Sequence, residues 1–324
     1  MSDGRRSFRI VFMGTPDFAV PPLVRMADGP DEVVAVVTQP DRARGRGQKV
    51  TISPVKAAAL ERGIEVLQPE RIKGKRGAEF RARMEALAPE LIVVAAYGKI
   101  LPVSLLELPT LDCINVHASL LPRWRGASPL HHALLAGDTE SGVSIMRMEE
   151  GLDTGPVFLK RAIPVGEETD CADLHDRLAD LGAEALMEAL ELFRAGPVEP
   201  EAQDDALATY APMLDKKDGC LDFGASALEL ARRVRALHPW PGTYTGCRGK
   251  LLKVLAAKAL ATPSGAAPGT VTAATDAGID VACGEGTLRL SRVQLAGKRV
   301  MDAADLVNGR GVEAGDLLSD PDAS

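Results

Sequence analysis

From Phe8 to about Arg194, short apolar runs alternate with longer stretches of helical periodicity. This alternation is typical of βαβ units, which build a mostly parallel sheet with helices on both faces. The run from Leu91 to Ala96 is apolar throughout, as expected for a strand that is covered on both faces. The pattern therefore predicts a doubly wound α/β domain, with strands at residues 8–13, 32–38, 64–67, 90–97, 112–117, 142–148 and 156–163.

A long helix from about Cys171 to Phe193 is expected to end this domain. The next segment, AGPVEPEAQDDALAT, is rich in proline and acidic residues. This composition predicts an exposed linker. We therefore expect a first domain over residues 1–194, a linker over 195–209 and a second domain over 210–318.

The pattern changes after the linker. Ser226 and Glu229 have the spacing of a capping box, which predicts the start of a helix, and the prolines of HPWPGT end it. Short strand-like runs follow, separated by glycine and proline turns, at residues 250–260, 269–274, 278–283 and 286–295. This spacing predicts a small antiparallel β-barrel.

Charge separates the two expected domains. The formal net charge of the chain is −7, which argues against non-specific binding of nucleic acid by the whole molecule. From Leu228 to Val300, however, eleven Lys or Arg residues face four Asp or Glu residues, a local net charge of +7. A basic second domain indicates either a binding surface for a polyanion or simply a solvated barrel surface.

Cysteine usage and hydropathy limit the class of protein. The five cysteines are far apart and form no CxxC pair, so we expect neither a disulfide framework nor a zinc site. The basic N-terminus runs directly into the strand-like FRIVFM, which leaves no room for a signal peptide. No apolar run approaches the roughly 20 residues of a membrane span. We expect a soluble, cytoplasmic protein.

The first expected strand-to-helix turn, MGTPDFAVPP, contains one glycine and no GxGxxG pattern. A dinucleotide pyrophosphate needs those glycines for close approach to the backbone, so a nicotinamide-dependent dehydrogenase is disfavoured. The turn is either a plain connection into a helix or the edge of a ligand site.

The segment CINVHASLLPRWRGASPL contains the strongest local signal for chemistry. Asn115 and His117 are two residues apart on an expected strand, so their side chains share one face at its carboxyl end. Ligands bind at this end in open α/β sheets. An amide donor beside an imidazole suits the attack of an amine on a formyl carbon, because Asn115 can stabilise an oxyanion and His117 can transfer protons. A structural histidine is the alternative.

A carboxylate is a candidate third member of this site. Asp153 lies between two glycines in EEGLDTGPVF, in a short loop between two expected strands. It could turn back toward the sheet and orient His117, favour its charged form or order a water molecule. The alternative is a local turn that uses the aspartate side chain.

The residues after His117 suggest a binding wall. Ser119, Leu120, Leu121 and Pro122 place two apolar side chains and a proline turn beside the expected site, where they could contact a flat heterocycle or fill the core. In the following PRWRGASP, an arginine could meet a carboxylate tail or a phosphate.

A basic loop follows the second expected strand. In QPDRARGRGQKVTISPVK, the cationic residues are spaced by Gly45 and Gly47. A flexible cationic loop of this kind suits contacts with a nucleic-acid backbone or base edges, and a solvated loop without a partner is the alternative. The candidate residues for contact are Arg42, Arg44, Arg46 and Lys49.

Several of these motifs occur together in a fixed order. MGTPDF, QPDR, SPVK, VVAAYGKILP, INVHASLLPRWRGASP and GLDTG are followed by HPWPGT and AGK. With this combination, the chain resembles the folate-dependent formyltransferases over about residues 8–312. NVHxSLLP with a downstream GLDTG is typical of the wider class. The QPDR loop and the additional C-terminal domain narrow the resemblance to the bacterial methionyl-tRNA formyltransferase family.

The resemblance implies an activity and its substrates. A formyl group would pass from 10-formyltetrahydrofolate, a co-substrate, to the α-amino group of initiator methionyl-tRNA, giving N-formylmethionyl-tRNA for translation initiation. No metal would be required. The first domain would be Rossmann-like, and the second would be a barrel resembling an OB fold that binds tRNA. We expect a cytoplasmic monomer.

The resemblance also implies roles for individual residues. Asn115, His117 and Asp153 match the catalytic residues of the family, and Ser119 to Pro122 match its folate-binding SLLP motif. Arg46 matches the arginine of the loop that enters the tRNA acceptor end. The chain departs from the pattern at Ala118, where a glycine is expected, and at Arg44, which adds a charge.

Other functions stay open at this point. The same chemistry could act on a different amine, such as a purine-pathway ribonucleotide or an amino sugar, or could hydrolyse the formyl-folate. An RNA-binding protein with a scaffold-like α/β half is an alternative from another class, and a dehydrogenase is the weakest alternative.

Overall fold

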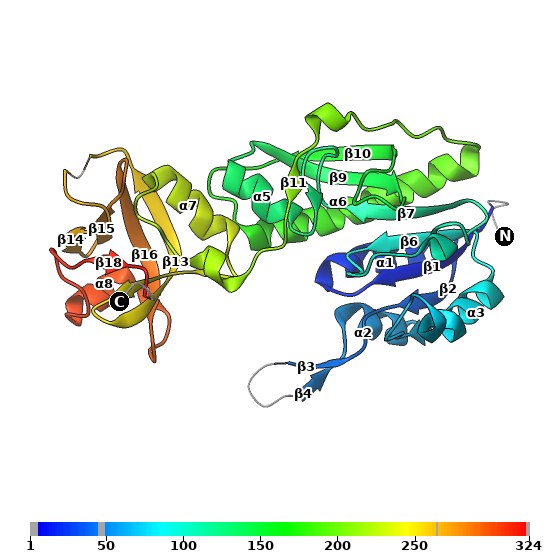
Figure 1. The fold of residues 1–324 in the computed structure, drawn as a ribbon, viewed down its shortest axis with the longest axis horizontal. Helices are drawn as coiled ribbons and strands as arrows, with labels where there is room; N and C mark the ends of the chain where they lie inside the picture. The colour runs from blue at the N-terminus through cyan, green and yellow to red at the C-terminus, as the bar shows by residue number, and fades with distance from the viewer. Residues whose placement is uncertain (1–5, 45–48, 264, 322–324) are drawn as a thin grey trace. The chain divides into compact units, whose positions relative to one another are not determined.

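The computed structural model describes residues 6–44, 49–263 and 265–321, which form two compact units (Figure 1). The first unit comprises the chain up to Pro129 together with Glu140–Pro164 and His175–Tyr210. The second unit comprises Leu130–Thr139, Val165–Leu174 and the chain from Ala211 onward. Each unit has its own core and is described separately.

The first unit is built on a seven-stranded sheet with the order β10-β9-β7-β6-β1-β2-β5. The strands from β5 to β7 are parallel, whereas β9 pairs with both neighbours in the antiparallel sense. The short connection from β9 to β10 can only form a hairpin, since a parallel pair needs a longer crossover. The strands are β1 (Arg9–Gly14), β2 (Glu32–Val37), β5 (Val66–Leu67), β6 (Leu91–Ala95), β7 (Asp112–His117), β9 (Glu140–Arg147) and β10 (Val157–Pro164).

Helices cover both faces of this sheet, which confirms the predicted doubly wound arrangement. On one face, Phe80 and Met84 pack in one apolar cluster with Met13 of β1. On the other face, a Cβ added at Gly182 would lie 3.0 Å from Val116 of β7, so a helix backbone lies directly on the sheet. The helices are α1 (Val20–Ala27), α2 (Pro54–Glu61), α3 (Ala78–Leu87), α4 (Val103–Leu106) and α6 (Cys171–Ala195), with short 3₁₀ turns at η1 (Asp17–Ala19) and η2 (Lys75–Gly77).

The basic segment after β2 is partly a hairpin, although a loop was expected. Strands β3 (Arg42–Arg44) and β4 (Lys49–Thr51) pair in the antiparallel sense. The backbone groups that face each other are thereby paired within the hairpin. Arg46 lies outside the described residues.

The segment predicted as a linker is largely exposed, yet it is bound to the first unit. The backbones of Glu201 and Val157 exchange two hydrogen bonds of 2.8 and 2.9 Å. The segment then forms η3 (Asp205–Leu207), and β11 (Tyr210–Ala211) pairs with β8 (Arg125–Gly126). Proline and acidic residues favour exposure, but they do not prevent the backbone from pairing with a neighbouring edge.

The second unit contains a fully antiparallel sheet with the order β14-β15-β16-β13-β12-β18, and β17 also pairs with β16. A bridge between Thr270 and Leu317, beside β14 and β18, joins the two ends of the sheet, as expected for a small barrel. The predicted strands are confirmed, and β12 was missed. The strands are β12 (Thr243–Cys247), β13 (Lys250–Leu260), β14 (Val271–Thr275), β15 (Gly278–Ala282), β16 (Thr287–Leu295), β17 (Met301–Asp302) and β18 (Leu318–Ser319).

Two helices complete the core of the second unit. Leu230 and Val234 of α7 (Ala227–Ala236) pack in one apolar cluster with Val254 and Leu290 of the barrel. The predicted capping box at the start of α7 is confirmed, because Ser226 and Glu229 bond each other's backbone amides. The unit also contains α8 (Ala303–Asn308), α5 (Pro129–Ala136) except for its first residue, and η4 (Lys216–Gly219).

Candidate active site

The carboxyl end of β7 carries the first two candidate catalytic residues. Asn115 is half-buried and His117 is buried. Both alternate with Val116, which faces α6, so their side chains share the opposite face of the sheet. The strand alternation predicted from the sequence therefore positions the amide and the imidazole together.

His117 is oriented by a backbone carbonyl. Its Nε2 atom lies 3.0 Å from the carbonyl oxygen of Trp124. Because a carbonyl oxygen only accepts hydrogen bonds, Nε2 carries the proton in this arrangement. In the neutral ring, Nδ1 then has the lone pair and is the atom that can take up a proton.

The carboxylate of Asp153 faces that nitrogen. Asp153 Oδ2 lies 3.7 Å from His117 Nδ1, which is too long for a hydrogen bond but within the range of an ion pair once the ring is protonated. The backbone amide of Gly126 donates to the same oxygen at 2.8 Å. Asp153 can thus stabilise the imidazolium form of His117, and its own position is fixed by the loop that contains Trp124.

The Asp153 backbone adopts the left-handed conformation, with φ of 53°. This conformation costs most residues other than glycine about 1–2 kcal/mol, and aspartate is one of the few that adopt it more readily, at a smaller cost than that. The neighbouring Gly155 has no room for a side chain, since an added Cβ would lie 2.0 Å from the Arg147 carbonyl oxygen. The two glycines and the strained aspartate together allow the loop between β9 and β10 to return the carboxylate to the sheet edge.

The SLLP segment is divided between the protein interior and the exposed surface. Ser119 Oγ donates to the Arg123 carbonyl at 2.7 Å, and Leu121 packs against Met146 and Val157. Leu121 therefore fills the core, as one of the two alternatives expected. Leu120 and Pro122 are half-buried and are the members of the segment that retain exposed surface.

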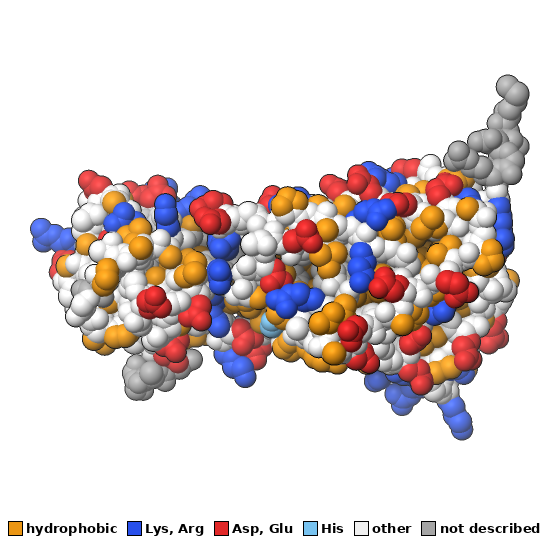
Figure 2. All heavy atoms as spheres, turned by 90° about the horizontal axis from the view of Figure 1, so that it is seen from above, with side chains coloured by type: hydrophobic (Ala, Val, Ile, Leu, Met, Phe, Trp, Pro, Cys, Tyr) orange, Lys and Arg blue, Asp and Glu red, His pale blue; other side chains and the backbone are white. Residues whose placement is uncertain are grey.

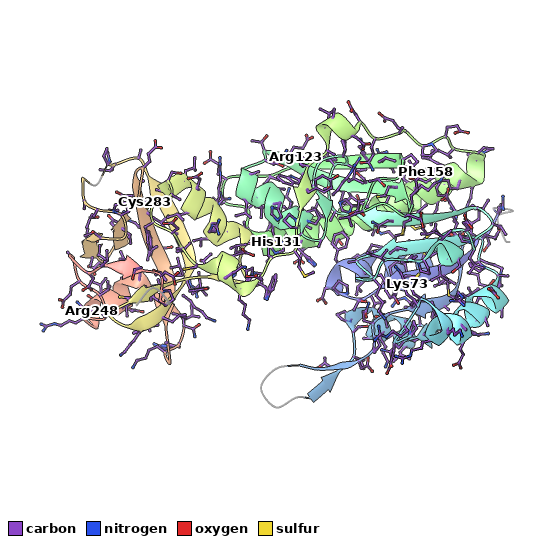
Figure 3. All side chains as sticks on the ribbon, viewed as in Figure 1. Lys73, Arg123, His131, Phe158, Arg248 and Cys283 are labelled. Carbon is purple, nitrogen blue, oxygen red and sulfur yellow. The ribbon has the colours of Figure 1, made fainter. Side chains whose placement is uncertain are left out.

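The two arginines after this segment serve different purposes. The guanidinium of Arg123, labelled in Figure 3, stacks over the Trp124 ring at 4.3 Å from its centroid. Arg125 is only 2% exposed, and its Nη2 donates to Asp205 at 2.7 Å. Arg125 is therefore committed to an internal contact. Of the two arginines in this segment, only Arg123 remains a candidate to meet a ligand carboxylate or phosphate.

A pocket of about 360 Å³ lies at the same edge of the sheet. Of its lining, only the turn after β1 was considered as the edge of a ligand site, which is one of the two alternatives given for that turn. Its lining residues follow directly after β1, β2 and β6, which is the position where the sequence could have indicated it. The hydroxyl of Tyr97 is buried without a partner among the described residues, and burial raises the pKa of Tyr97 to about 12. The lining includes Thr15, Pro16, Gln39, Asp41, Ser53 and Tyr97.

A charged pair fixes one wall of this pocket. Lys56 Nζ lies 2.5 Å from Asp41 Oδ2, and this hydrogen bond lowers the pKa of the Asp41 carboxyl. Gln39 Nε2 donates to the Tyr97 carbonyl at 3.0 Å, which links the segments that follow β2 and β6. The pocket is thus polar, and hydrogen bonds between the segments that line it hold its walls together. Thr15, in the turn after β1, is part of this lining.

Three of the four predicted tRNA-binding residues belong to the strands of the hairpin described above, and Arg46 lies outside the described residues. Arg42 and Arg44 belong to β3 and Lys49 to β4. On the surface drawn in Figure 2, side chains of both signs are interspersed.

The residues that the structure describes contain no cluster of metal ligands. Among them, no group of three or more His, Cys, Asp or Glu side chains is arranged to hold a metal ion. Over the same residues, no helix combines the length and the apolar character needed to cross a membrane.

Two family models match the chain. Residues 8–190 match the model described as formyl transferase, and residues 213–311 match that of the formyl transferase C-terminal domain. The first match covers the sheet that carries Asn115, His117 and Asp153. The fold and the site thus define a formyltransferase.

Curated relatives narrow the assignment. The chain is 52% identical to methionyl-tRNA formyltransferase of Pseudomonas fluorescens strain Pf0-1, over 93% of each chain. It is 48% identical to the protein of the same name from Citrifermentans bemidjiense, over 98% of each chain. The chain belongs to the methionyl-tRNA formyltransferase family.

Solved structures share the fold at low sequence identity. HypX from Aquifex aeolicus, solved in complex with tetrahydrofolic acid, matches with a TM-score of 0.62 and 17% identity. The match covers 93% of this chain, which spans about half of HypX, 47% of that chain. The sugar 3N-formyl transferase WlaRD matches with a TM-score of 0.64 and 15% identity, over 91% of this chain and 100% of the other.

Proposed function

We propose that the chain transfers the formyl group of 10-formyltetrahydrofolate to the α-amino group of initiator methionyl-tRNA. The observation that carries the proposal is the approach of Asp153 to within 3.7 Å of His117 Nδ1, beside Asn115 at the end of β7. The high identity to relatives named methionyl-tRNA formyltransferase supports the choice of acceptor.

The reaction exchanges one carbon–nitrogen bond for another. The deprotonated α-amine attacks the formyl carbon, and the carbonyl oxygen becomes an oxyanion. The Asn115 amide donates a hydrogen bond to that oxygen, which stabilises the transition state more than the ground state. The bond from the formyl carbon to folate N10 then breaks.

His117 moves the proton that this exchange releases. The attacking nitrogen loses a proton, and folate N10 gains one as it leaves. His117 Nδ1 accepts the first proton, and Asp153 stabilises the resulting imidazolium until the ring returns a proton to N10. The number of protons balances, and the donor leaves as tetrahydrofolate.

The remaining assignments are parts of the same proposal. Ser119 to Pro122 would contact the folate, with Leu120 and Pro122 supplying the exposed surface. Residues Arg42, Arg44, Arg46 and Lys49 would contact the tRNA acceptor end, together with the basic second domain.

The proposed domain limits are 1–194 for the catalytic domain, 195–209 for the linker and 210–318 for the tRNA-binding domain. We place the enzyme in the cytoplasm, which agrees with five free cysteines, four of them buried. We propose that it acts as a monomer.

The test is transfer of labelled formyl from 10-formyltetrahydrofolate. Methionyl-tRNA should acquire the label, whereas free methionine and uncharged tRNA should not. The His117→Ala variant should lose about 100-fold or more of the single-turnover rate. Label on none of the acceptors would contradict the proposed function, and an unchanged rate in the variant would contradict the role of His117.

A further inference from the structure

The segment that leads out of the first unit contacts both loops of the candidate site. Thr209 Oγ1 accepts a hydrogen bond from the Trp124 amide at 2.9 Å, and the Arg125 amide donates to the Thr209 carbonyl at 2.9 Å. Trp124 is the residue whose carbonyl orients His117. The segment therefore fixes one side of the site through backbone contacts.

Gln203 of this segment joins the other side. Its Nε2 donates to the carbonyl oxygens of Asp153 at 2.8 Å and Gly155 at 2.6 Å. Its Oε1 accepts from Arg125 Nε at 3.0 Å. One half-buried amide thus bonds the loop that contains Asp153 and the loop that contains Trp124 at the same time.

The chemistry of this position requires an amide. Two carbonyl oxygens need two N–H donors, and the arginine Nε–H needs an acceptor. A carboxylate of the same shape would place negative charge against both carbonyls and would donate to neither. Asparagine is one methylene shorter and cannot reach both loops from the same backbone position.

The backbone of Asp153 needs such a partner. A left-handed conformation at a residue other than glycine persists only where the surroundings hold it. Gly126 holds the Asp153 carboxylate and Gln203 holds its backbone carbonyl. Without the hydrogen bond from Gln203, the carboxylate would no longer be held at a fixed distance from His117.

We propose that Gln203 is a positioning residue for formyl transfer, which acts by holding Asp153 against His117. The proposal rests on the proposed function, because it assigns to Asp153 the stabilisation of protonated His117. Gln203 itself touches neither reacting atoms nor, in this proposal, either substrate.

The kinetic test is a double-mutant cycle with Asp153→Asn. Gln203→Glu should lower the single-turnover rate about 10- to 100-fold and leave the KM of both substrates within about twofold. In the Asp153→Asn background, the same change should cost less than about twofold, because the group that it positions is already altered. An equal loss in both backgrounds, or no loss in the wild type, would overturn the proposal.

Gln203→Met, which removes the polar atoms without adding charge, should give the same pattern if Gln203→Glu is poorly folded. Glu201→Gln is the matched control on the same segment, because the Glu201 side chain is exposed and the change leaves intact the backbone that pairs with Val157. Its single-turnover rate should match the wild type.

A second measurement needs no substrate. In protein labelled with ¹⁵N-histidine, Gln203→Glu should move the His117 ring resonances toward their positions in Asp153→Asn, and Glu201→Gln should leave them in place. Unmoved resonances in Gln203→Glu would overturn the proposal. Failure of the wild type to formylate methionyl-tRNA would instead contradict the proposed function alone.

Discussion

At the scale of single residues, the two nitrogens of His117 face different partners. The carbonyl of Trp124 fixes the proton of the neutral ring on Nε2, while Nδ1 faces the Asp153 carboxylate. A ring held in this way can change charge without turning. The orientation of the ring therefore depends on the loops that hold the two partners, as well as on the strand that carries His117.

Asn115 gives the first prediction at this scale. Asn115→Ala should lower the single-turnover rate of formyl transfer by about 10²–10³, because the donor to the oxyanion is removed. The KM values should change little, since the interaction forms in the transition state. Rapid-quench measurement with labelled donor, with circular dichroism to verify folding, gives both quantities.

Asn115→Asp keeps the shape of the side chain but replaces the donor with a negative charge. Its rate should fall at least as far as that of Asn115→Ala. A rate close to the wild type in either variant would show that Asn115 does not stabilise the oxyanion.

The sequence predicts the placement of some of these residues but not of others. Asn115 and His117 share a face because strand alternation is a local property. The approach of Asp153 depends on a hairpin and a strained backbone, and the contact with Gln203 spans 50 residues. No local sequence period indicates either the approach of Asp153 or its contact with Gln203. The proline-rich and acidic composition of the segment that contains Gln203 predicted only that this segment is exposed.

At the scale of elements, most strands were predictable because buried apolar runs have few alternatives. The antiparallel direction of β9 and the hairpin of β3 and β4 were not, since pairing is decided by neighbours distant in sequence. The helix α7 was predictable from both its period and its cap. Its start depends on two reciprocal bonds between Ser226 and Glu229.

This capping box gives a pH-dependent prediction. The backbone amide of Ser226 and then its hydroxyl bond the Glu229 carboxylate and lower its pKa from the ordinary value of 4.5. A lowered pKa in the folded state stabilises the protein above the unfolded value, and this contribution disappears as the pH falls through the folded value. Glu229→Gln should therefore be less stable than the wild type near neutral pH. The difference should shrink as the pH falls below the ordinary value of 4.5 and should vanish once the pH is below the lowered pKa of the folded state.

Urea unfolding in a Trp124→Phe background checks this prediction, since Trp240 then reports on the second unit alone. The matched control is Asp276→Asn in the second unit, an exposed residue in the turn between β14 and β15 that begins no helix. A difference between wild type and Glu229→Gln that stayed constant with pH would mean that the charge of the carboxylate is not what stabilises α7.

At the scale of the whole molecule, charge is divided unequally along the chain. The net charge is −7, yet residues 228–300 carry eleven Lys or Arg against four Asp or Glu. The acidic remainder repels a polyanion, so productive binding of tRNA must be directed by local basic groups. This division favours approach of the tRNA to the barrel and the basic hairpin over the rest of the surface.

Salt dependence tests this interpretation. Because binding to phosphates releases counterions, the logarithm of KM for methionyl-tRNA should rise linearly with the logarithm of salt concentration. The KM for the folate donor should change much less. Replacing the exposed Lys298 and Arg299 with Gln should reduce the slope of this line by about 1 for each phosphate that the variant no longer neutralises.

The matched control is the double variant Lys73→Gln and Arg76→Gln, which removes two exposed cations of the first unit and should leave the slope unchanged. Equal slopes in all three proteins would exclude Lys298 and Arg299 from tRNA binding and would leave the basic hairpin as the main electrostatic site.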